Sequence, residues 1–209
     1  MPIYPKYDKK LIPKKNVFVI SCIDLRLTDD TVRFLHNDNL ANRYDHFILA
    51  GTSLCTCVED KADYKNNRAK FNPEALTAYQ DFKDWRTSLN HHLAIAIKLH
   101  HVKDVYIIEH TNCGAYKEFL KEEFSDPDIE VEQHKHYAEA LAKELSETNY
   151  EELKLDDNGM PKKTDEGYET EKYNLKVHCY LINLRGDVDH LSSFHKVKGK
   201  VEQLMQSDV

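Results

Sequence analysis

The sequence lacks long apolar runs, clustered glycines and an excess of positive charge, and each absence excludes a class of protein. A membrane helix needs about 18 consecutive apolar residues, and the 209-residue sequence contains no run of that length. The six glycines never come closer than eight positions, whereas nucleotide-phosphate loops need several within a few residues. The net charge of -7 comes with both signs interspersed, so no broad basic field is available for nucleic acid. We therefore expect neither a membrane nor a nucleic acid as partner.

The N-terminal arm, residues 1–15, also lacks the apolar segment of a secretory signal, since it is polar and rich in lysine. This predicts a cytoplasmic protein. In a reducing compartment, thiols serve as metal ligands, nucleophiles or small buried residues more often than as disulfides. The chain has five cysteines to assign: Cys22, Cys55, Cys57, Cys113 and Cys179.

What the sequence does contain is a set of short apolar runs alternating with helical patterns. Near-continuous runs at 17–20, 47–50 and 105–108, and a more mixed run at 177–184, predict buried parallel strands. Helices are predicted at 29 to about 40, 74–101, 114–124 and 130–147, and an exposed loop at 156–172. This alternation predicts a single α/β domain over residues 1–209, with a mostly parallel central sheet of about four or five strands flanked by helices.

Two of the predicted strands run directly into chemically reactive side chains. Cys22, Asp24 and Arg26 follow the first strand at alternating positions, so they face one side if the chain stays extended. His110 and Cys113 follow the third strand at the start of a predicted helix. Because ligands collect at the carboxyl ends of strands in an open α/β sheet, both segments are candidate sites.

A cysteine from one strand end, with a histidine and a cysteine from another, makes a soft ligand set suited to zinc. Three protein ligands would leave the fourth position for water, which is the catalytic arrangement. Two structural alternatives stay open. Any single buried cysteine can be a small core residue, and Asp24 or Cys55 could close a purely structural site with four ligands.

The two segments resemble the two signatures of the β-class carbonic anhydrases. The matching residues are Cys22-x-Asp24-x-Arg26 and His110-x-x-Cys113-Gly114, and the resemblance spans roughly residues 16–124. It implies one Zn(II) per chain bound by Cys22, His110 and Cys113, with Asp24 and Arg26 as catalytic residues. The implied activity is that of a carbonate dehydratase, a zinc lyase that reversibly hydrates carbon dioxide to bicarbonate and a proton.

The middle strand departs from this family, because only Ala50-Gly51 remains of a run that is commonly Arg-Asn-Ala-Gly-Asn. Three alternatives therefore stay open: a carbon disulfide or carbonyl sulfide hydrolase on the same fold, a non-catalytic zinc protein, and nucleophilic catalysis by Cys113 with His110. Retention of Asp24 and Arg26 disfavours the second. The third leaves Cys22 without a role.

Two further expectations concern cysteine chemistry and assembly. Cys55 and Cys57 could form a second metal site or a redox pair, but no histidine lies beside them, so an incidental pair is favoured. The resemblance implies a homodimer or a dimer of dimers, formed partly through the N-terminal arm. The aromatic residues Tyr4, Tyr7, Phe82 and Trp85, if they do not all reach the core, are more than the surface of one domain would expose. A self-complementary patch formed by the N-terminal arm is therefore expected.

Overall fold

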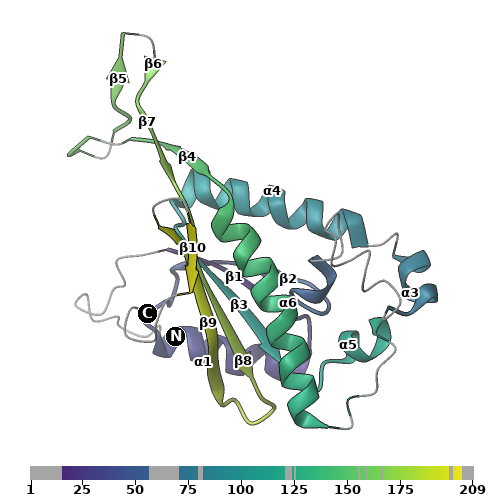
Figure 1. Ribbon diagram of the computed structural model, residues 1–209. Coiled ribbons are helices and arrows are strands. Elements are labelled where there is room, and N and C mark those ends of the chain that lie inside the picture. Colours follow the sequence, from purple (N-terminus) through teal and green to yellow (C-terminus); the bar gives the residue numbers. More distant parts are fainter. Residues whose placement is uncertain are drawn as a thin grey trace, which may run out of the picture.

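Four adjacent strands run parallel in the twisted sheet of the computed structural model (Figure 1). These strands are β1 (Val17–Ser21), β2 (Tyr44–Ile48), β3 (Asp104–His110) and β8 (Lys176–Ile182), in the order β2-β1-β3-β8. The structure describes residues 16–56, 71–79, 82–120, 124, 126–154, 156–158, 160–165, 167–197 and 200–203. The predicted α/β class with a mostly parallel sheet is confirmed.

Two antiparallel strands widen this sheet beyond the predicted four or five strands. β9 (Val188–Val197) pairs with β8, and β10 (Lys200–Gln203) pairs with β9, which makes six strands. The apolar-run criterion missed β9 because this strand carries serines and histidines among its apolar residues.

Helices cover both faces of the sheet (Figure 1). α4 (Lys83–His100) and α6 (Pro127–Glu147) pack on the face that carries Phe18 and Ile20 of β1. α1 (Thr28–Asn37) packs on the face that carries Val17 and Val19. Alternate residues of a strand point to opposite faces, so an apolar run without alternation needs cover on both sides.

The predicted helix 74–101 is wrong as a continuous element, because it is divided into α3 (Pro73–Ala78) and α4. Phe82, the residue before α4, has a left-handed backbone with φ of 61° and is fully buried. Its ring packs 4.8 Å from that of Phe119 and 5.2 Å from that of Trp85, centroid to centroid. Burial of this aromatic ring outweighs the local helical pattern.

Other predicted boundaries shift by several residues. β2 begins earlier than the apolar run 47–50, because it is an edge strand whose pairing with β1 starts at Tyr44 opposite Val17. α5 (Gly114–Phe119) ends before 124, where Leu120 turns to an extended backbone. A short 3-10 helix, η2 (Leu25–Leu27), leads into α1, and another, η3 (Leu54–Thr56), follows β2.

The segment 156–172, predicted as an exposed loop, is exposed but contains strands. β5 (Lys163–Thr164) pairs with β6 (Gly167–Tyr168), and β7 (Thr170–Tyr173) pairs with β4 (Tyr150–Leu153). Figure 1 shows this arm projecting away from the main sheet. Among the residues that the structure describes, no helix combines the length and the apolar character that a membrane crossing requires.

Candidate metal centre

The three predicted ligands meet at the carboxyl ends of β1 and β3. Ser21 at the end of β1 lies opposite Ile108 of the adjacent parallel strand, so Cys22 and His110 emerge at the same edge of the sheet. Cys113 directly precedes α5. Potential ligand atoms of these three residues all lie within 4.8 Å of one another, and they form the one such group of three found among the described residues.

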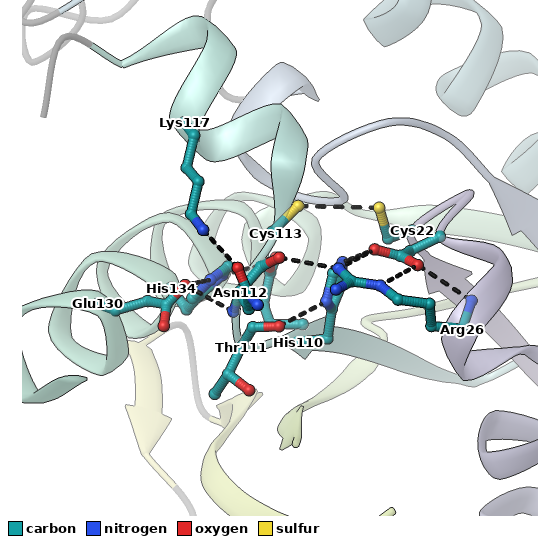
Figure 2. A network of polar contacts seen from close by, with 11 residues as sticks. Cys22, Arg26, His110, Thr111, Asn112, Cys113, Lys117, Glu130 and His134 are labelled. Carbon is teal, nitrogen blue, oxygen red and sulfur yellow. Dashed lines mark hydrogen bonds and ion pairs between the residues drawn. The ribbon is translucent and has the colours of Figure 1, made fainter. Parts of the chain in front are cut away.

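The spacing of the two sulfurs fits a tetrahedral metal ion. Cys22 Sγ and Cys113 Sγ are 3.9 Å apart (Figure 2). Two thiolates bound to tetrahedral zinc at the usual bond length would lie about 3.8 Å apart. Because the two positions come from segments 91 residues apart, this spacing is a product of the sheet register and not of local sequence.

The Nε2 atom of His110 has a free lone pair and lies beside the two cysteine sulfurs. Its Nδ1 atom lies 2.9 Å from the carbonyl oxygen of Thr111, which can only accept a hydrogen bond, so Nδ1 carries the proton. The neutral ring then has an unprotonated Nε2. This atom is buried and has no hydrogen-bond partner, although a buried polar nitrogen without a partner is costly. A metal ion would satisfy it, so the donor set fits zinc.

The charges of the two cysteines also favour a cation. The hydrogen bond from Cys113 holds the pKa of Cys22 at about 4, although burial opposes this shift. The same contact with Cys22, together with burial, raises the pKa of Cys113. One thiolate therefore forms readily, while the second is opposed by the first. A dication that neutralises both thiolates would remove this opposition.

Asp24 and Arg26 form an ion pair beside the three ligands, but not by the predicted extended geometry. The chain turns into η2, and Asp24 caps that turn by accepting a hydrogen bond from the Arg26 backbone N–H at 3.0 Å. The chain therefore does not stay extended from Cys22 to Arg26, and the condition under which the three side chains would share one face is not met. The turn lets the Arg26 guanidinium donate from Nε to Asp24 Oδ1 at 2.9 Å and from Nη2 to Asp24 Oδ2 at 2.6 Å.

This bidentate pair holds the Asp24 carboxylate beside the three candidate ligands. The hydrogen bonds from Arg26 lower the pKa of Asp24 to about 2. Asp24 Oδ2 lies 3.9 Å from His110 Nε2, close to the ligand atoms but held by the guanidinium. Arg26 NH2 also donates to the backbone carbonyl of Asn112 at 2.9 Å, which ties the pair to the loop between β3 and α5 (Figure 2).

A small cavity of about 150 Å³ opens beside Cys22, Asp24 and His110. Its other lining residues are of two kinds. The apolar ones include Ile23, Leu27, Ile48, Ile108 and Ile182, and the polar ones are Ser21, Thr28, Thr31 and His46. His46 Nε2 lies 2.7 Å from Ser21 Oγ, and burial lowers the pKa of His46. The cavity therefore offers both an apolar wall and a neutral imidazole.

Gly51 lies beside Cys55 in a backbone conformation that favours glycine. Its φ of +72° is a conformation that favours glycine, and a backbone hydrogen bond from Gly51 helps to lower the pKa of Cys22. Cys55 is fully buried in η3 beside Gly51, and Cys57 lies outside the described residues, so the suggested pair is not tested. Cys179 lies in the buried core of β8, as expected.

Sequence reasoning missed a buried polar network behind the site. Glu109, fully buried on β3, accepts hydrogen bonds from the Ser53 backbone N–H at 3.0 Å and from the Ser53 hydroxyl. It also accepts from Tyr116 Oη at 3.2 Å and lies 2.9 Å from His134 Nδ1 of α6. The available signal was a carboxylate in an otherwise apolar strand, because buried charges need several partners.

The aromatic residues invoked for assembly do not act as one surface. Phe82 is buried in the core, which corrects its assignment to a subunit interface, and Trp85 is partly buried against that core. Tyr4 and Tyr7, like the whole N-terminal arm 1–15, lie outside the described residues.

Comparisons with known sequences give no assigned function. No family model matches the chain. An uncharacterized protein of Rickettsia bellii is 26% identical over 191 residues, covering 91% of this chain and 90% of that protein. An uncharacterized protein of Rickettsia conorii is 26% identical over 114 residues, which is 54% of this chain and 50% of that protein.

Several solved structures with a similar arrangement are carbonic anhydrases. The β-carbonic anhydrase isoform I of Trichomonas vaginalis has a TM-score of 0.41 and 14% identity, with 91% of this chain and 88% of that chain covered. A carbonic anhydrase of Glaciozyma antarctica has a TM-score of 0.32 and 15% identity, with 88% of each chain covered. Likenesses at these values assign no activity to this chain.

Proposed function

We propose that this protein is a zinc-dependent carbonic anhydrase that reversibly hydrates carbon dioxide to bicarbonate and a proton. The observation that carries the proposal is the buried, unpartnered Nε2 of His110 beside two cysteine sulfurs spaced for one metal ion. One zinc per chain, bound by Cys22, His110 and Cys113, would supply a nucleophilic water at neutral pH.

The residues around the proposed zinc would orient the reacting water and accommodate the substrate. Asp24, held in place by Arg26, accepts a hydrogen bond from the reacting water and so orients it toward the substrate. Two thiolates neutralise a dication, which makes this orientation by neighbouring groups more important. The apolar wall formed by Ile48, Ile108 and Ile182 suits a small linear substrate without charge.

His46 is the group best placed to take up the proton that hydration releases. It lines the same cavity, and its Nε2 atom lies 2.7 Å from Ser21 Oγ. Burial lowers the pKa of this imidazole, so it is neutral at pH 7 and can accept a proton.

The apolar cavity wall also favours a second candidate, hydrolysis of carbon disulfide or carbonyl sulfide at the same zinc. These molecules are linear and uncharged like carbon dioxide, and the same side chains would accept them. A non-catalytic zinc protein is less well supported, since a purely structural metal has no need of the Asp24–Arg26 pair.

Assembly as a homodimer or a dimer of dimers, and a cytoplasmic location, stay predictions from the sequence. If the assembly forms, the residues 1–15 that the resemblance implicates are the first segment to test.

The test combines metal analysis with rate measurements on one preparation. We expect about one zinc per chain and carbon dioxide hydration that a Cys113→Ser variant loses. Stoichiometric zinc with hydrolysis of carbon disulfide or carbonyl sulfide, and no hydration, would replace the first candidate by the second. Zinc without any of these activities would support the non-catalytic alternative.

A further inference from the structure

We propose that Glu130 of α6 is a positioning residue that holds Arg26, and through it Asp24, in the active arrangement. The inference rests on the proposed function for its catalytic consequence. Its structural basis is a chain of contacts from α6 to the loop between β3 and α5 and from there to the guanidinium (Figure 2).

Asn112 is the centre of this chain, and its backbone is strained. It has a φ of 58°, in the left-handed region that asparagine adopts more readily than most residues but at some cost. Such a conformation persists when several contacts determine it together. Here the Asn112 carbonyl accepts the hydrogen bond from Arg26, and the Asn112 side-chain oxygen accepts one from Lys117.

Glu130 fixes the backbone N–H of Asn112 through a hydrogen bond. Its Oε1 atom accepts the Asn112 backbone N–H at 2.6 Å, and its side chain is only 12% exposed. A hydrogen bond to a charged acceptor is short and strong, so this anchor can maintain a strained backbone. The same oxygen lies 3.9 Å from the fully buried His134 Nε2, which places Glu130 against a rigid part of the core.

The consequence for the site follows from the position of the Asn112 carbonyl. The Arg26 side chain is 43% exposed, and its Nη2 atom donates to two acceptors, Asp24 Oδ2 and the Asn112 carbonyl oxygen. Without Glu130 the Asn112 backbone can relax and the carbonyl can turn away. The Arg26 guanidinium then keeps only its hydrogen bonds to Asp24, which lies on the same short turn. The Asp24–Arg26 pair can therefore move as a unit relative to Cys22, His110 and Cys113.

Three variants separate this role from a general loss of structure. Glu130→Ala removes the acceptor, and Glu130→Gln keeps an oxygen acceptor without the charge. The control, Glu132→Ala, removes an exposed glutamate of the same helix. We expect hydrogen exchange at the Asn112 amide to accelerate about tenfold or more in Glu130→Ala. The exchange rate should stay near that of the parent in Glu132→Ala. In Glu130→Gln it should lie between the rates of the parent and of Glu130→Ala, because a neutral acceptor makes a weaker hydrogen bond.

Two further measurements test the link to Arg26. The zinc content of Glu130→Ala should stay at the parent value, while the visible spectrum of its cobalt(II)-substituted form should change as in Arg26→Ala. The turnover number of Glu130→Ala should fall about tenfold, and that of Glu130→Gln should lie between the values of Glu130→Ala and the parent. In an Arg26→Ala background, Glu130→Ala should cost less than about twofold further, because both changes act on one unit.

Unchanged Asn112 exchange, loss of zinc from Glu130→Ala, or independent effects of the two substitutions would each overturn the proposal. The exchange rates and the cobalt spectra do not depend on turnover. They therefore decide the structural role of Glu130 even if the parent protein does not hydrate carbon dioxide, which would reject only the proposed function.

Discussion

Replacing Arg26 by alanine is expected to abolish most activity while leaving the fold nearly as stable as before. The substitution removes two hydrogen bonds to Asp24, at 2.9 and 2.6 Å, and one to the Asn112 carbonyl at 2.9 Å. The Arg26 side chain is 43% exposed, and exposed ion pairs contribute about 0.2–1 kcal/mol to stability. A loss of orientation around a metal centre typically costs about 10- to 100-fold in activity.

The loss should come from orientation and not from protonation of Asp24. Arg26 is the main cause of the low pKa of about 2 for Asp24, against an ordinary value of 3.8. Without Arg26 the pKa rises toward that ordinary value, and at pH 7 on the order of one carboxyl group in a thousand would be protonated. The freed carboxylate stays charged and can turn toward the metal ligands, since Oδ2 is already 3.9 Å from His110 Nε2.

The assay is a pH–rate profile of carbon dioxide hydration for the parent and Arg26→Ala, with urea unfolding as the control for stability. Activity should fall at neutral pH and recover in part at alkaline pH, where hydroxide competes with the carboxylate for the metal. The depressed pKa of Asp24 contributes stability that is fully present above about pH 3.8 and is lost as the pH falls toward 2. The small difference in the free energy of unfolding between the parent and Arg26→Ala should therefore be constant above pH 5 and shrink as the pH falls toward 2. A profile that Arg26→Ala leaves unchanged would refute the coupling.

Four further predictions test the ligands, the carboxylate, the glycine and the assembly. Cys113→Ser should lose zinc on dialysis while Cys55→Ser retains it; equal loss in both would reject the ligand assignment. Asp24→Asn should keep its zinc and lose about 10- to 100-fold in activity, so zinc loss in this variant would make Asp24 a ligand. Gly51→Ala should lower the free energy of unfolding by about 1–3 kcal/mol, measured by urea titration, because φ is +72° and the new Cβ would lie 3.1 Å from Cys55 Sγ. Sedimentation should show a dimer or tetramer that weakens when residues 1–14 are deleted; an active, zinc-containing monomer at micromolar concentration would contradict it.

The sequence by itself determined the fold class and the types of side chain at the candidate site. Near-continuous apolar runs predict strands that are covered on both faces, and polar residues directly after two of them predict a site at the carboxyl edge. These inferences depend on local patterns, and the structure places Cys22, His110 and Cys113 together as expected. The same local patterns missed the break between α3 and α4 and the two antiparallel strands β9 and β10, where burial and strand pairing decide the outcome.

Only the tertiary structure decided how these residues can work together. The sulfurs of Cys22 and Cys113, 91 residues apart in the sequence, lie 3.9 Å from each other, and Arg26 donates a hydrogen bond to the distant Asn112 carbonyl. Glu130 reaches the Asn112 N–H from a helix 18 residues further along the chain. Distances of this kind depend on the packing of α6 against the sheet and on the strand register, and neither is encoded in the spacing of any one motif. The sequence thus predicts which side chains can take part in the chemistry, but only the complete fold determines their relative orientation.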